Sequence, residues 1–356
     1  MPTSIKFLRA EHGDSILIQH KTTNSRFTIL IDGGPTTAFR NYSTRNDGNL
    51  KIELDNLIAT STPIDLLVLT HIDSDHIGGL LEGFKEPAYL PTMVKRVWFN
   101  SATSVAKHFS QEVKAEHYIN DDFSDSLKTS IKEGETFEAL VKAHKIWDEE
   151  LIDTSFTPIV PSGIDIKILS PDNQKLERLL KKWKPYNANE DLSTSGCSHD
   201  YSDSYSKLLE TDTFKEDKSS PNGSSISLLL EAEGKKVLLL ADAHPSIVAQ
   251  SLIKLGYSDV NPLECELIKL SHHGSKKNTS PELLSLVKTP RFIVTTDGSS
   301  HCLPNKTTFA RIHRAHPNSK ILFNYPELIR KIYSPKEIQE LGERIGSIEE
   351  AIQIAN

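Results

Sequence analysis

The hydrophobic residues of this chain fall mainly in short runs that end at turn residues. Such runs occupy residues 4–10, 14–20, 27–34, 64–71, 94–100, 164–171, 225–232, 235–242, 265–273, 291–298 and 320–325. Their lengths, and the Gly, Pro, Asn and Asp that flank them, are typical of β-strands rather than helices. The pattern therefore predicts a protein rich in short strands.

Helical periodicity appears between several of these runs, at residues 173–183, 245–256 and 280–288. Hairpin-like strands come first, then strands alternate with helices, and a second set of strands follows. This order predicts an α/β fold in which two mixed sheets stack and helices cover both outer faces, an αββα four-layer sandwich.

Two stretches interrupt this scheme. Residues 101–155 form a charged, helix-rich insertion, and residues 187–223 are polar and rich in Ser and Asp, which predicts a flexible flap. We expect one domain over residues 1–325 that carries both insertions, followed by a helical tail over residues 326–356.

Charge, hydrophobic runs and cysteine content argue against several classes of protein. The 356 residues carry a formal net charge of −7, which argues against a surface that coats nucleic acid non-specifically. The N-terminus has no basic segment followed by a long apolar one, and no apolar run approaches the roughly 18 residues of a membrane span. The three cysteines show no CxxC spacing and suit a reducing compartment, so we expect a cytoplasmic protein without membrane contact.

The stretch "THIDSDHIGG", residues 70–79, follows an apolar strand and crowds four possible metal ligands together. In extended backbone His71 and Asp73 project to the same side, and Asp75 and His76 follow as the chain turns into a helix at about Ile77. Carboxylates at the rim of a core are poorly solvated unless a cation compensates them. A metal site is therefore the favoured interpretation, and a solvated turn with chance histidines is the alternative.

Two further strand ends carry similar chemistry. Asp242 closes the run "KKVLLLAD", and His272, His273 and Ser275 follow the run "CELIKL". Imidazole and carboxylate ligands without thiolates suit Zn²⁺, Mn²⁺ or iron, and a high carboxylate content favours Mn²⁺.

These motifs together resemble the metallo-β-lactamase superfamily, whose metal motif reads HxHxDH. Here the motif reads "HIDSDH", with Asp73 at the place of the second histidine. Within the superfamily the chain is similar to the ComEC-type competence (DNA-uptake) branch, through "HGDSILI", "ILIDGG", "LTHIDSDHIGGL", "LLLADA" and "LSHHGS" in that order. The resemblance covers about residues 4–325 and implies the same αββα sandwich.

The resemblance also implies a site with two divalent metal ions, Zn²⁺ or Mn²⁺. It assigns Asp242 as the ligand that bridges them and Asp75 as the ligand that also orients the attacking water. Asp32 would hold a ligand histidine in place, and Asp14 would cap its hairpin turn near the metals. The implied metal ligands are His71, Asp73, Asp75, His76, Asp242, His273 and His301.

Several roles stay open in the sequence. One of His272 and His273 is expected to be a ligand and the other a proton donor or substrate contact, because the two cannot both point the same way from a strand end; we take His272 as catalytic. His301 is either a ligand, a leaving-group contact or a plain loop histidine. Asn222 replaces the additional histidine of many superfamily members and either binds a substrate phosphate or caps a turn.

The resemblance predicts hydrolysis by a hydroxide bridged by two divalent cations. The ComEC-like motifs favour a phosphodiester substrate, a nucleic acid or nucleotide, which Ser275, Lys276 and Lys277 would contact; a solvated basic turn is the alternative for the lysines. A lactone or ester hydrolase is a second hypothesis. A third is a non-catalytic effector subunit of a bacterial system, such as anti-phage defence, that contacts a protein partner through its insertions.

Overall fold

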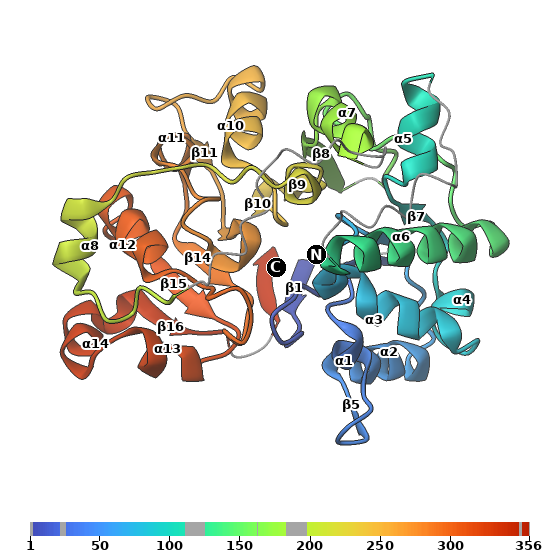
Figure 1. Cartoon of the computed structure of the whole chain (residues 1–356), viewed down its shortest axis with the longest axis horizontal. Helices are drawn as coiled ribbons and strands as arrows, with labels where there is room; N and C mark the ends of the chain where they lie inside the picture. Colours follow the sequence, from blue (N-terminus) through green and yellow to red (C-terminus); the bar gives the residue numbers. More distant parts are fainter. Residues whose placement is uncertain are drawn as a thin grey trace.

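The structure, a computed structural model, describes residues 3–21, 26–110, 125–161, 163–182, 198–348 and 351–355. Two β-sheets stack face to face, and helices cover the outer face of each (Figure 1). The α/β class and the αββα sandwich expected from the sequence are confirmed.

The first sheet has the strand order β17-β1-β2-β3-β6-β7. β1, β2 and β3 form an antiparallel meander, and β6 and β7 continue the sheet in parallel. The strands are β1 Thr3–Phe7, β2 Ile16–Lys21, β3 Arg26–Ile31, β6 Leu66–Val68, β7 Val97–Trp98 and β17 Ile352–Ala355.

The second sheet has the order β16-β15-β14-β12-β10-β9-β8. β8, β9 and β10 are antiparallel, whereas β10, β12, β14, β15 and β16 run parallel. Its strands are β8 Ile164–Ser170, β9 Ser227–Ala232, β10 Lys235–Leu239, β12 Leu267–Lys269, β14 Arg291–Val294, β15 Lys320–Phe323 and β16 Ile345–Ser347. Two small ladders pair β4 Arg40–Asn41 with β5 Asn46–Asp47 and β11 Leu263–Glu264 with β13 Val287–Lys288.

The helices divide between the two outer layers. Those on the first sheet are α1 Thr36–Phe39, α2 Asn49–Ala59, α3 Ser74–Lys85, α4 Leu90–Met93, α5 Ala102–His108, α6 Asp125–Ala143 and α7 Asn173–Lys182. Those on the second are α10 Pro245–Lys254, α11 Pro281–Ser285, α12 Lys306–Ala315, α13 Glu327–Ile332 and α14 Pro335–Leu341. Short elements in the connections are α8 Tyr205–Thr211, α9 Ser220–Gly223 and the 3₁₀ turns η2 Ser271–Gly274 and η3 Gly342–Arg344.

Three hydrophobic cores hold the layers together, one between the sheets and one under each helical layer. Alternation along the strands creates this division, because successive side chains point to opposite faces. In β3, Ile29 and Ile31 face the other sheet, while Leu30 packs under the helices. Full burial of such an aliphatic side chain contributes roughly 1.5–3 kcal/mol to folding.

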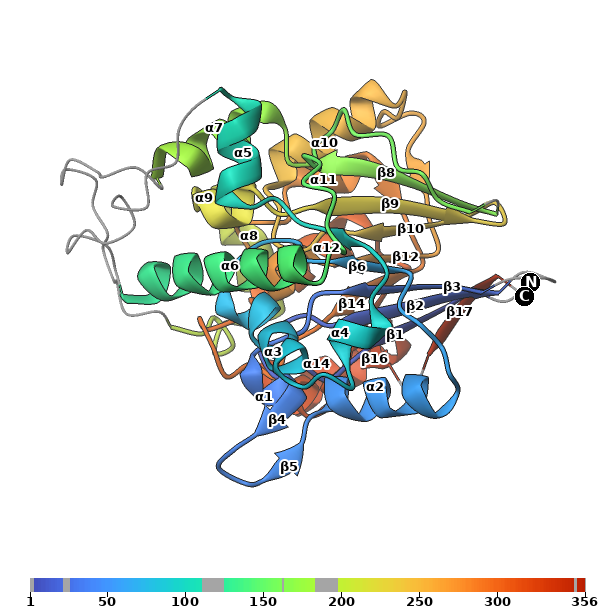
Figure 2. The ribbon, with the colours of Figure 1, turned by 90° about the vertical axis from the view of Figure 1, so that its right-hand side faces the viewer.

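The C-terminal tail differs from its predicted form. α13 and α14 are helical as expected, but β16 extends the second sheet and β17 pairs with β1, antiparallel, at the edge of the first. The two ends of the described chain therefore lie side by side (Figure 2). The amphipathic pattern of the tail misled the prediction: the β-branched Ile352 and Ile354, two residues apart, belong to a strand that completes a sheet edge, which local pattern alone does not reveal.

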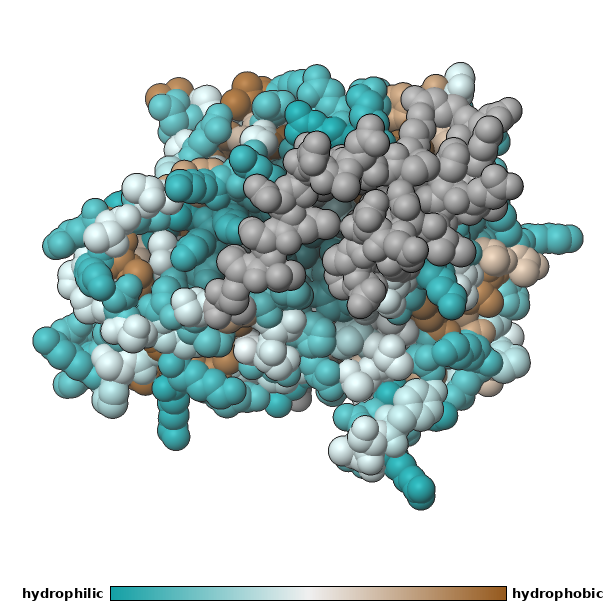
Figure 3. Space-filling model, viewed as in Figure 1, coloured by the Kyte–Doolittle hydropathy of each residue, from teal (hydrophilic) through white to brown (hydrophobic). Residues whose placement is uncertain are grey.

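Part of the predicted flexible flap, residues 198–218, packs across the molecule and is named here the strap. Its side chains make partly buried hydrogen bonds with α12, in a segment for which the sequence predicted a flexible flap. The remaining flap residues 187–197, and part of the insertion at 101–155, lie outside the described residues. The described residues on the face seen in Figure 3 are mainly hydrophilic, with apolar residues in small groups.

The described helices include none long and apolar enough to cross a membrane. Cys265 is a buried free thiol, whereas Cys302 is disulfide-bonded. The disulfide at Cys302 differs from the sequence expectation that the cysteines suit a reducing compartment.

Candidate metal centre

The predicted ligands converge where three strands of the two sheets end. Residues 71–76 follow β6, Asp242 follows β10, and the histidine pair follows β12. Parallel strands bring their carboxyl ends to the same edge of a sheet, which is where open α/β sheets build their sites. The stacking of the two sheets then places the loop after β6 against the loops after β10 and β12.

The helix α3 begins at Ser74, three residues before the predicted start. Asp73 is its N-cap residue, yet the Asp73 side chain makes no capping hydrogen bond; the backbone carbonyl instead accepts from the amide of His76 at 2.9 Å. The Asp73 carboxylate is thus free to face the neighbouring histidine. Asp75 and His76 lie in the first turn of α3.

Four side chains form a group named here cage A: His71, Asp73, Asp242 and His272. Nε2 of His71 lies 3.6 Å from Oδ2 of Asp73 and 3.8 Å from Oδ2 of Asp242. Nε2 of His272 lies 3.7 Å from the same Asp242 oxygen. Ligand atoms about 2.1 Å from a tetrahedral ion are about 3.4 Å apart. Each of these three separations is 0.2–0.4 Å longer than that.

Four side chains form a second group, cage B: Asp75, His76, Asp242 and His273. Nε2 of His76 lies 3.6 Å from Oδ1 of Asp242 and 3.9 Å from Oδ2 of Asp75. Nε2 of His273 lies 3.4 Å from Oδ2 of Asp75 and 4.0 Å from Oδ1 of Asp242. Asp242 therefore offers one carboxylate oxygen to each cage, the geometry expected of a bridging ligand.

The residues fit divalent cations on a second ground. Nε2 of His71, His76 and His273 and Oδ1 of Asp242 are buried and have no hydrogen-bond partner among the described residues. A buried polar atom without a partner costs about 1–3 kcal/mol. Cations bound between these atoms would satisfy all four of them.

The opposite edge of each histidine is held by the protein, which leaves Nε2 toward the cages. Nδ1 of His76 lies 2.8 Å from Oδ2 of Asp32, which also accepts the Thr70 hydroxyl. Nδ1 of His273 donates to the carbonyl of Thr295 at 2.8 Å, and Nδ1 of His71 is 3.1 Å from the Thr70 hydroxyl. Such partners fix the ring orientation and the tautomer of a metal-ligating histidine. The structure thus places Asp32 where the sequence expected it.

Both histidines of the pair face Asp242, and the expectation that only one could do so is wrong. His272 and His273 have positive φ angles, 47° and 53°, so the chain coils in the left-handed region instead of continuing as a strand. Strand alternation no longer applies there, and both rings turn inward. The strain of two non-glycine residues in this region costs on the order of 1–3 kcal/mol each and is typical of functional sites.

Asp14 lies behind His273 and forms a buried ion pair with Lys269. The Thr295 hydroxyl donates to Asp14 Oδ1 at 2.6 Å, and Nδ1 of His273 is 3.5 Å from the same oxygen. Burial opposes ionisation of Asp14, but Lys269 and His273 outweigh it and hold the pKa of Asp14 below its usual value. The turn "HGDS" therefore supports the metal edge rather than only capping its own hairpin.

Two neighbouring carboxylates shift the pKa of His273. Burial lowers its pKa, but the charges of Asp14 and Asp242 outweigh burial and raise that pKa to about 10. A cation that enters cage B has to displace this proton, so metal affinity should rise with pH.

A pocket of about 540 Å³ opens beside cage A. Asp73 and His272 form part of its wall, so cage A faces solvent, whereas the cage B histidines are at most 3% exposed. The other wall residues are Ser198, Asp217, Ser219, Asn222, Ser275, Lys276, Lys277, His301, Cys302, Leu303 and Asn305.

The wall contains the predicted substrate residues. Lys276 is exposed, and Ser275 is buried with its hydroxyl accepting from the Lys277 amide at 3.2 Å. Asn222 is buried and donates to Asp217 at 2.7 Å. His301 is exposed, and no described carboxylate lies within ion-pair distance of it. His272 is the fourth member of cage A, and His301 lies instead on the pocket wall. The predicted role of His301 as a ligand therefore gains no support.

Sequence reasoning missed Lys269, Asp217 and Asn278, which contact the predicted residues from behind. Lys269 belongs to an apolar strand, and Asp217 lies in a polar stretch assigned to a flap. The one local signal was Asn278, five residues after the histidine pair, whose Oδ1 lies 3.3 Å from Nδ1 of His272.

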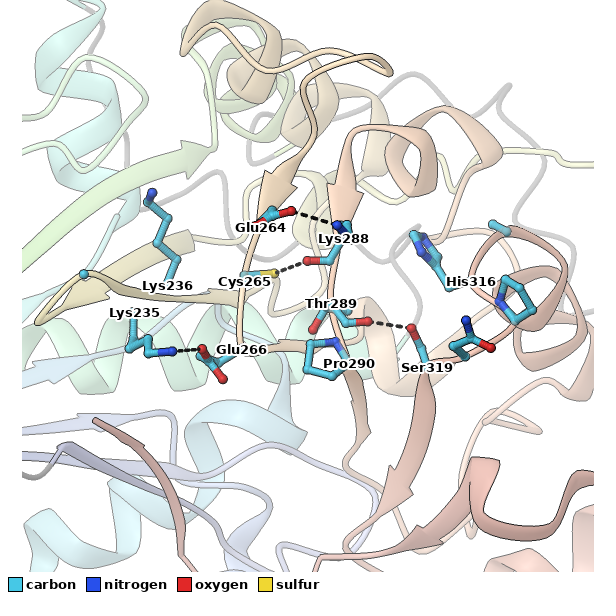
Figure 4. Close-up of a pocket in the computed structure, with 14 residues that line it drawn as sticks. Lys235, Lys236, Glu264, Cys265, Glu266, Lys288, Thr289, Pro290, His316 and Ser319 are labelled. Carbon is cyan, nitrogen blue, oxygen red and sulfur yellow. Dashed lines mark hydrogen bonds and ion pairs between the residues drawn. The ribbon is translucent and has the colours of Figure 1, made fainter. Parts of the chain in front are cut away.

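A larger pocket, about 710 Å³, lies at the opposite end of the second sheet, before β12, β14 and β15 (Figure 4). Its charged residues are paired: Lys235 with Glu266 at 2.7 Å and Lys288 with Glu264 at 2.8 Å. Burial raises the pKa of the Cys265 thiol there to about 12, which keeps it a poor nucleophile. This pocket therefore lacks, among the described residues, the unpaired buried groups that the cages contain.

The fold has many structural relatives of low sequence identity. YhfI from Bacillus subtilis, a metallo-beta-lactamase fold protein, aligns with a TM-score of 0.41 and 10% identity over 99% of this chain and 100% of its own. Zn(2+)-bound PqqB from Methylobacterium extorquens gives 0.42 and 10% over 96% and 87%. CmlA, a diiron beta-hydroxylase from Streptomyces venezuelae, gives 0.41 and 11% over 100% and 54%.

No curated protein sequence matches the chain. A family model described as the metallo-beta-lactamase superfamily matches residues 8–161, a span that includes "HGDSILI", "ILIDGG" and the metal motif at 71–76. Over this span, which is less than half of the chain, the chain is similar to the metallo-β-lactamase superfamily.

Proposed function

We propose that the chain is a metal-dependent phosphodiesterase or nuclease that binds two divalent cations, Zn²⁺ or Mn²⁺, in cages A and B. The observation that carries the proposal is the convergence of four histidines, from the strand ends after β6 and β12, on the two oxygens of Asp242 at 3.6–4.0 Å. Four of their buried polar atoms lack any other partner among the described residues.

When bound, the two cations would supply a hydroxide at neutral pH and stabilise negative charge on a phosphoryl oxygen. The residues of the chain position these reactants. Asp242 fixes the separation of the two cages, and Asp75 reaches from α3 to orient the attacking water at cage B. Asp32 and the Thr295 carbonyl keep the rings of His76 and His273 fixed, which limits reorganisation during the reaction.

The pocket beside cage A supports a phosphodiester over a neutral substrate. Lys276 and Lys277 stand exposed on its wall and can hold phosphate as point charges. The Lys276 amide donates to Oδ1 of Asn305 at 2.9 Å, which fixes the loop that carries both lysines. The sequence resemblance to the ComEC-type branch agrees with this substrate class.

Two other functions remain as hypotheses. A lactone or ester hydrolase would use the same cages on an uncharged carbonyl. A non-catalytic effector subunit would keep the metals for stability and contact a protein partner through residues 101–155 or 187–223.

Hydrolysis of bis-p-nitrophenyl phosphate by metal-loaded protein, measured beside a lactone panel, tests the proposal. We expect phosphodiester turnover that is lost in Asp242→Asn and kept in Asp259→Asn, a matched change in an exposed loop. Lactone turnover without phosphodiester turnover would establish the second hypothesis. Metal binding without any turnover would favour the effector.

A further inference from the structure

The strap links the outer helix α12 to the metal centre. Near its start, Asp200 accepts from the backbone amides of Lys306 and Thr307 at 2.8 and 2.9 Å, at the N-terminus of α12. Further along, Asp212 forms a two-pronged pair with the buried Arg311, at 2.8 and 2.6 Å. These contacts fix the course of the strap before it reaches the pocket.

The same arginine holds the loop that follows the histidine pair. Arg311 donates through Nη1 to the carbonyls of Lys276 and Thr279 at 2.9 and 2.5 Å. The amide of Asp217 donates to the carbonyl of Lys277 at 3.1 Å. The end of the strap and the loop after His272 are thus joined as one unit.

Asp217 presents its carboxylate to the back of His272. Its Oδ1 accepts from the Ser219 amide at 2.9 Å, and its Oδ2 accepts from Nδ2 of Asn222 at 2.7 Å and of Asn278 at 3.2 Å. With these three donors in place, Oδ2 lies 3.7 Å from Nδ1 of His272. The negative charge is therefore fixed on the side of the ring away from cage A.

This charge bears on which nitrogen of His272 carries the proton. Nδ1 lies near one acceptor and one donor. The acceptor is Oδ1 of Asn278 at 3.3 Å, and the donor is Nδ2 of Asn222 at 3.2 Å. If Nδ1 donates to Asn278, Nε2 is a free lone pair that faces Asp242. If Nδ1 instead accepts from Asn222, the proton of the neutral ring is on Nε2 and blocks coordination.

We propose that Asp217 is a positioning residue that keeps the proton of His272 on Nδ1, so that Nε2 is available to a cation and cage A reaches its full affinity. The inference rests on the proposed function, because it assumes that cage A binds a metal. It assigns to the strap a specific task, the completion of a ligand set from which the additional histidine of many superfamily members is missing.

The effect should be confined to cage A. Asp217 is within ion-pair distance of His272 and His244 only, among the described residues. The cage B histidines are held by other partners, Asp32 behind His76 and Thr295 behind His273. Loss of the Asp217 charge therefore leaves cage B intact.

Calorimetric titration of metal-free protein with Mn²⁺ alone tests the proposal. We expect two binding events in the wild type. In Asp217→Asn one event should weaken by roughly 10–100-fold, the usual loss when a partner behind a ligand histidine is removed, while the other stays unchanged. Asp203→Asn is the matched control, because its carboxylate lies on the same strap, is partly exposed and pairs with Lys207 rather than with a ligand histidine.

A double-mutant cycle tests whether Asp217 acts through His272. His272→Ala should abolish the event that Asp217→Asn weakens, and adding Asp217→Asn to His272→Ala should change nothing further. With Co²⁺ as the probe, Asp217→Asn should alter the visible absorption of one bound ion only.

Two results would overturn the positioning role. One is a pair of binding events unchanged in Asp217→Asn. The other is an equal weakening of both events together with lower thermal stability of the metal-free variant, the sign of a general structural defect. Failure of the wild type itself to bind two ions would be seen before any variant is made and would overturn the proposed function along with this inference.

Discussion

Polar side chains gather at both ends of the second sheet, but they are buried at one end and exposed at the other. At the carboxyl ends of β10 and β12, Asp242 and His273 are buried and hold polar atoms without partners among the described residues. At the other end, around the pocket of Figure 4, Lys288 and Glu264 are exposed and paired with each other. Pocket size alone would have favoured the second end, since its pocket is the larger, at about 710 Å³ against about 540 Å³.

The comparison shows that what distinguishes the candidate site from an ordinary surface is whether its polar atoms have partners, rather than how polar the residues are or how large the pocket is. Exposed ion pairs contribute about 0–1 kcal/mol and make no demand for a ligand. Buried unpartnered atoms destabilise the fold unless a bound species satisfies them. Substitutions at the carboxyl end of the sheet should therefore change stability, metal binding and turnover more than substitutions at the opposite end.

The largest effect should follow from Asp242→Asn. The substituted amide would keep the shape of the side chain but remove the charge that both cages share, so both cations should be lost together. Enzymes accelerate their reactions by at least about 10⁶-fold, and we expect phosphodiester turnover to fall by more than about 10⁴-fold. Metal content by mass spectrometry should fall in parallel. Turnover within tenfold of wild type would remove Asp242 from its bridging position.

A large stability effect is expected from Lys269→Met at the same end. Lys269 is fully buried, and its loss leaves the carboxylate of Asp14 buried without its cation. Breaking such a pair from one side typically costs about 3–5 kcal/mol, measurable by urea unfolding of metal-free protein. The double variant Asp14→Asn with Lys269→Met should recover part of this loss. If it recovers nothing, the cost lies in packing of the lysine stem and not in the unpaired charge.

Removal of the cations should have an intermediate effect. A ligand present at 100 times its dissociation constant stabilises the folded state by about 2.7 kcal/mol, so chelation should lower the melting temperature of wild-type protein. The melting temperature of Asp242→Asn should not respond to the chelator. An equal response in both proteins would mean that the stabilising ion binds elsewhere.

The sequence predicted the strands, and it placed the candidate ligands at strand ends that the structure brings together, because both signals are encoded locally. Runs such as "FTILIDGG" and "KKVLLLAD" alternate or end in ways that need no knowledge of distant residues, and both became strands. The convergence of the strand ends follows from parallel pairing within each sheet, β3 with β6 and β10 with β12, together with the stacking of the two sheets.

What the sequence could not predict depends on contacts between distant segments. β17 forms because β1 offers it an edge, and Asp217 reaches His272 because α12 holds the strap. The inward turn of both histidines depends on left-handed backbone that the letters "SHHGS" do not specify. The left-handed backbone begins at His272 and continues through His273 and Gly274.

The smallest effect should come from the opposite end of the sheet, with Lys288→Ala as the variant. Its partner Glu264 is 74% exposed and stays solvated when the lysine is removed, so water replaces the ion pair at little cost. We expect a change of no more than about 1 kcal/mol in the free energy of unfolding and unchanged metal content and turnover. Urea unfolding and the phosphodiester assay on the same preparation measure both. A loss of turnover comparable to that of Asp242→Asn would show that the larger pocket takes part in the reaction, and the distinction between the two ends of the sheet would fail.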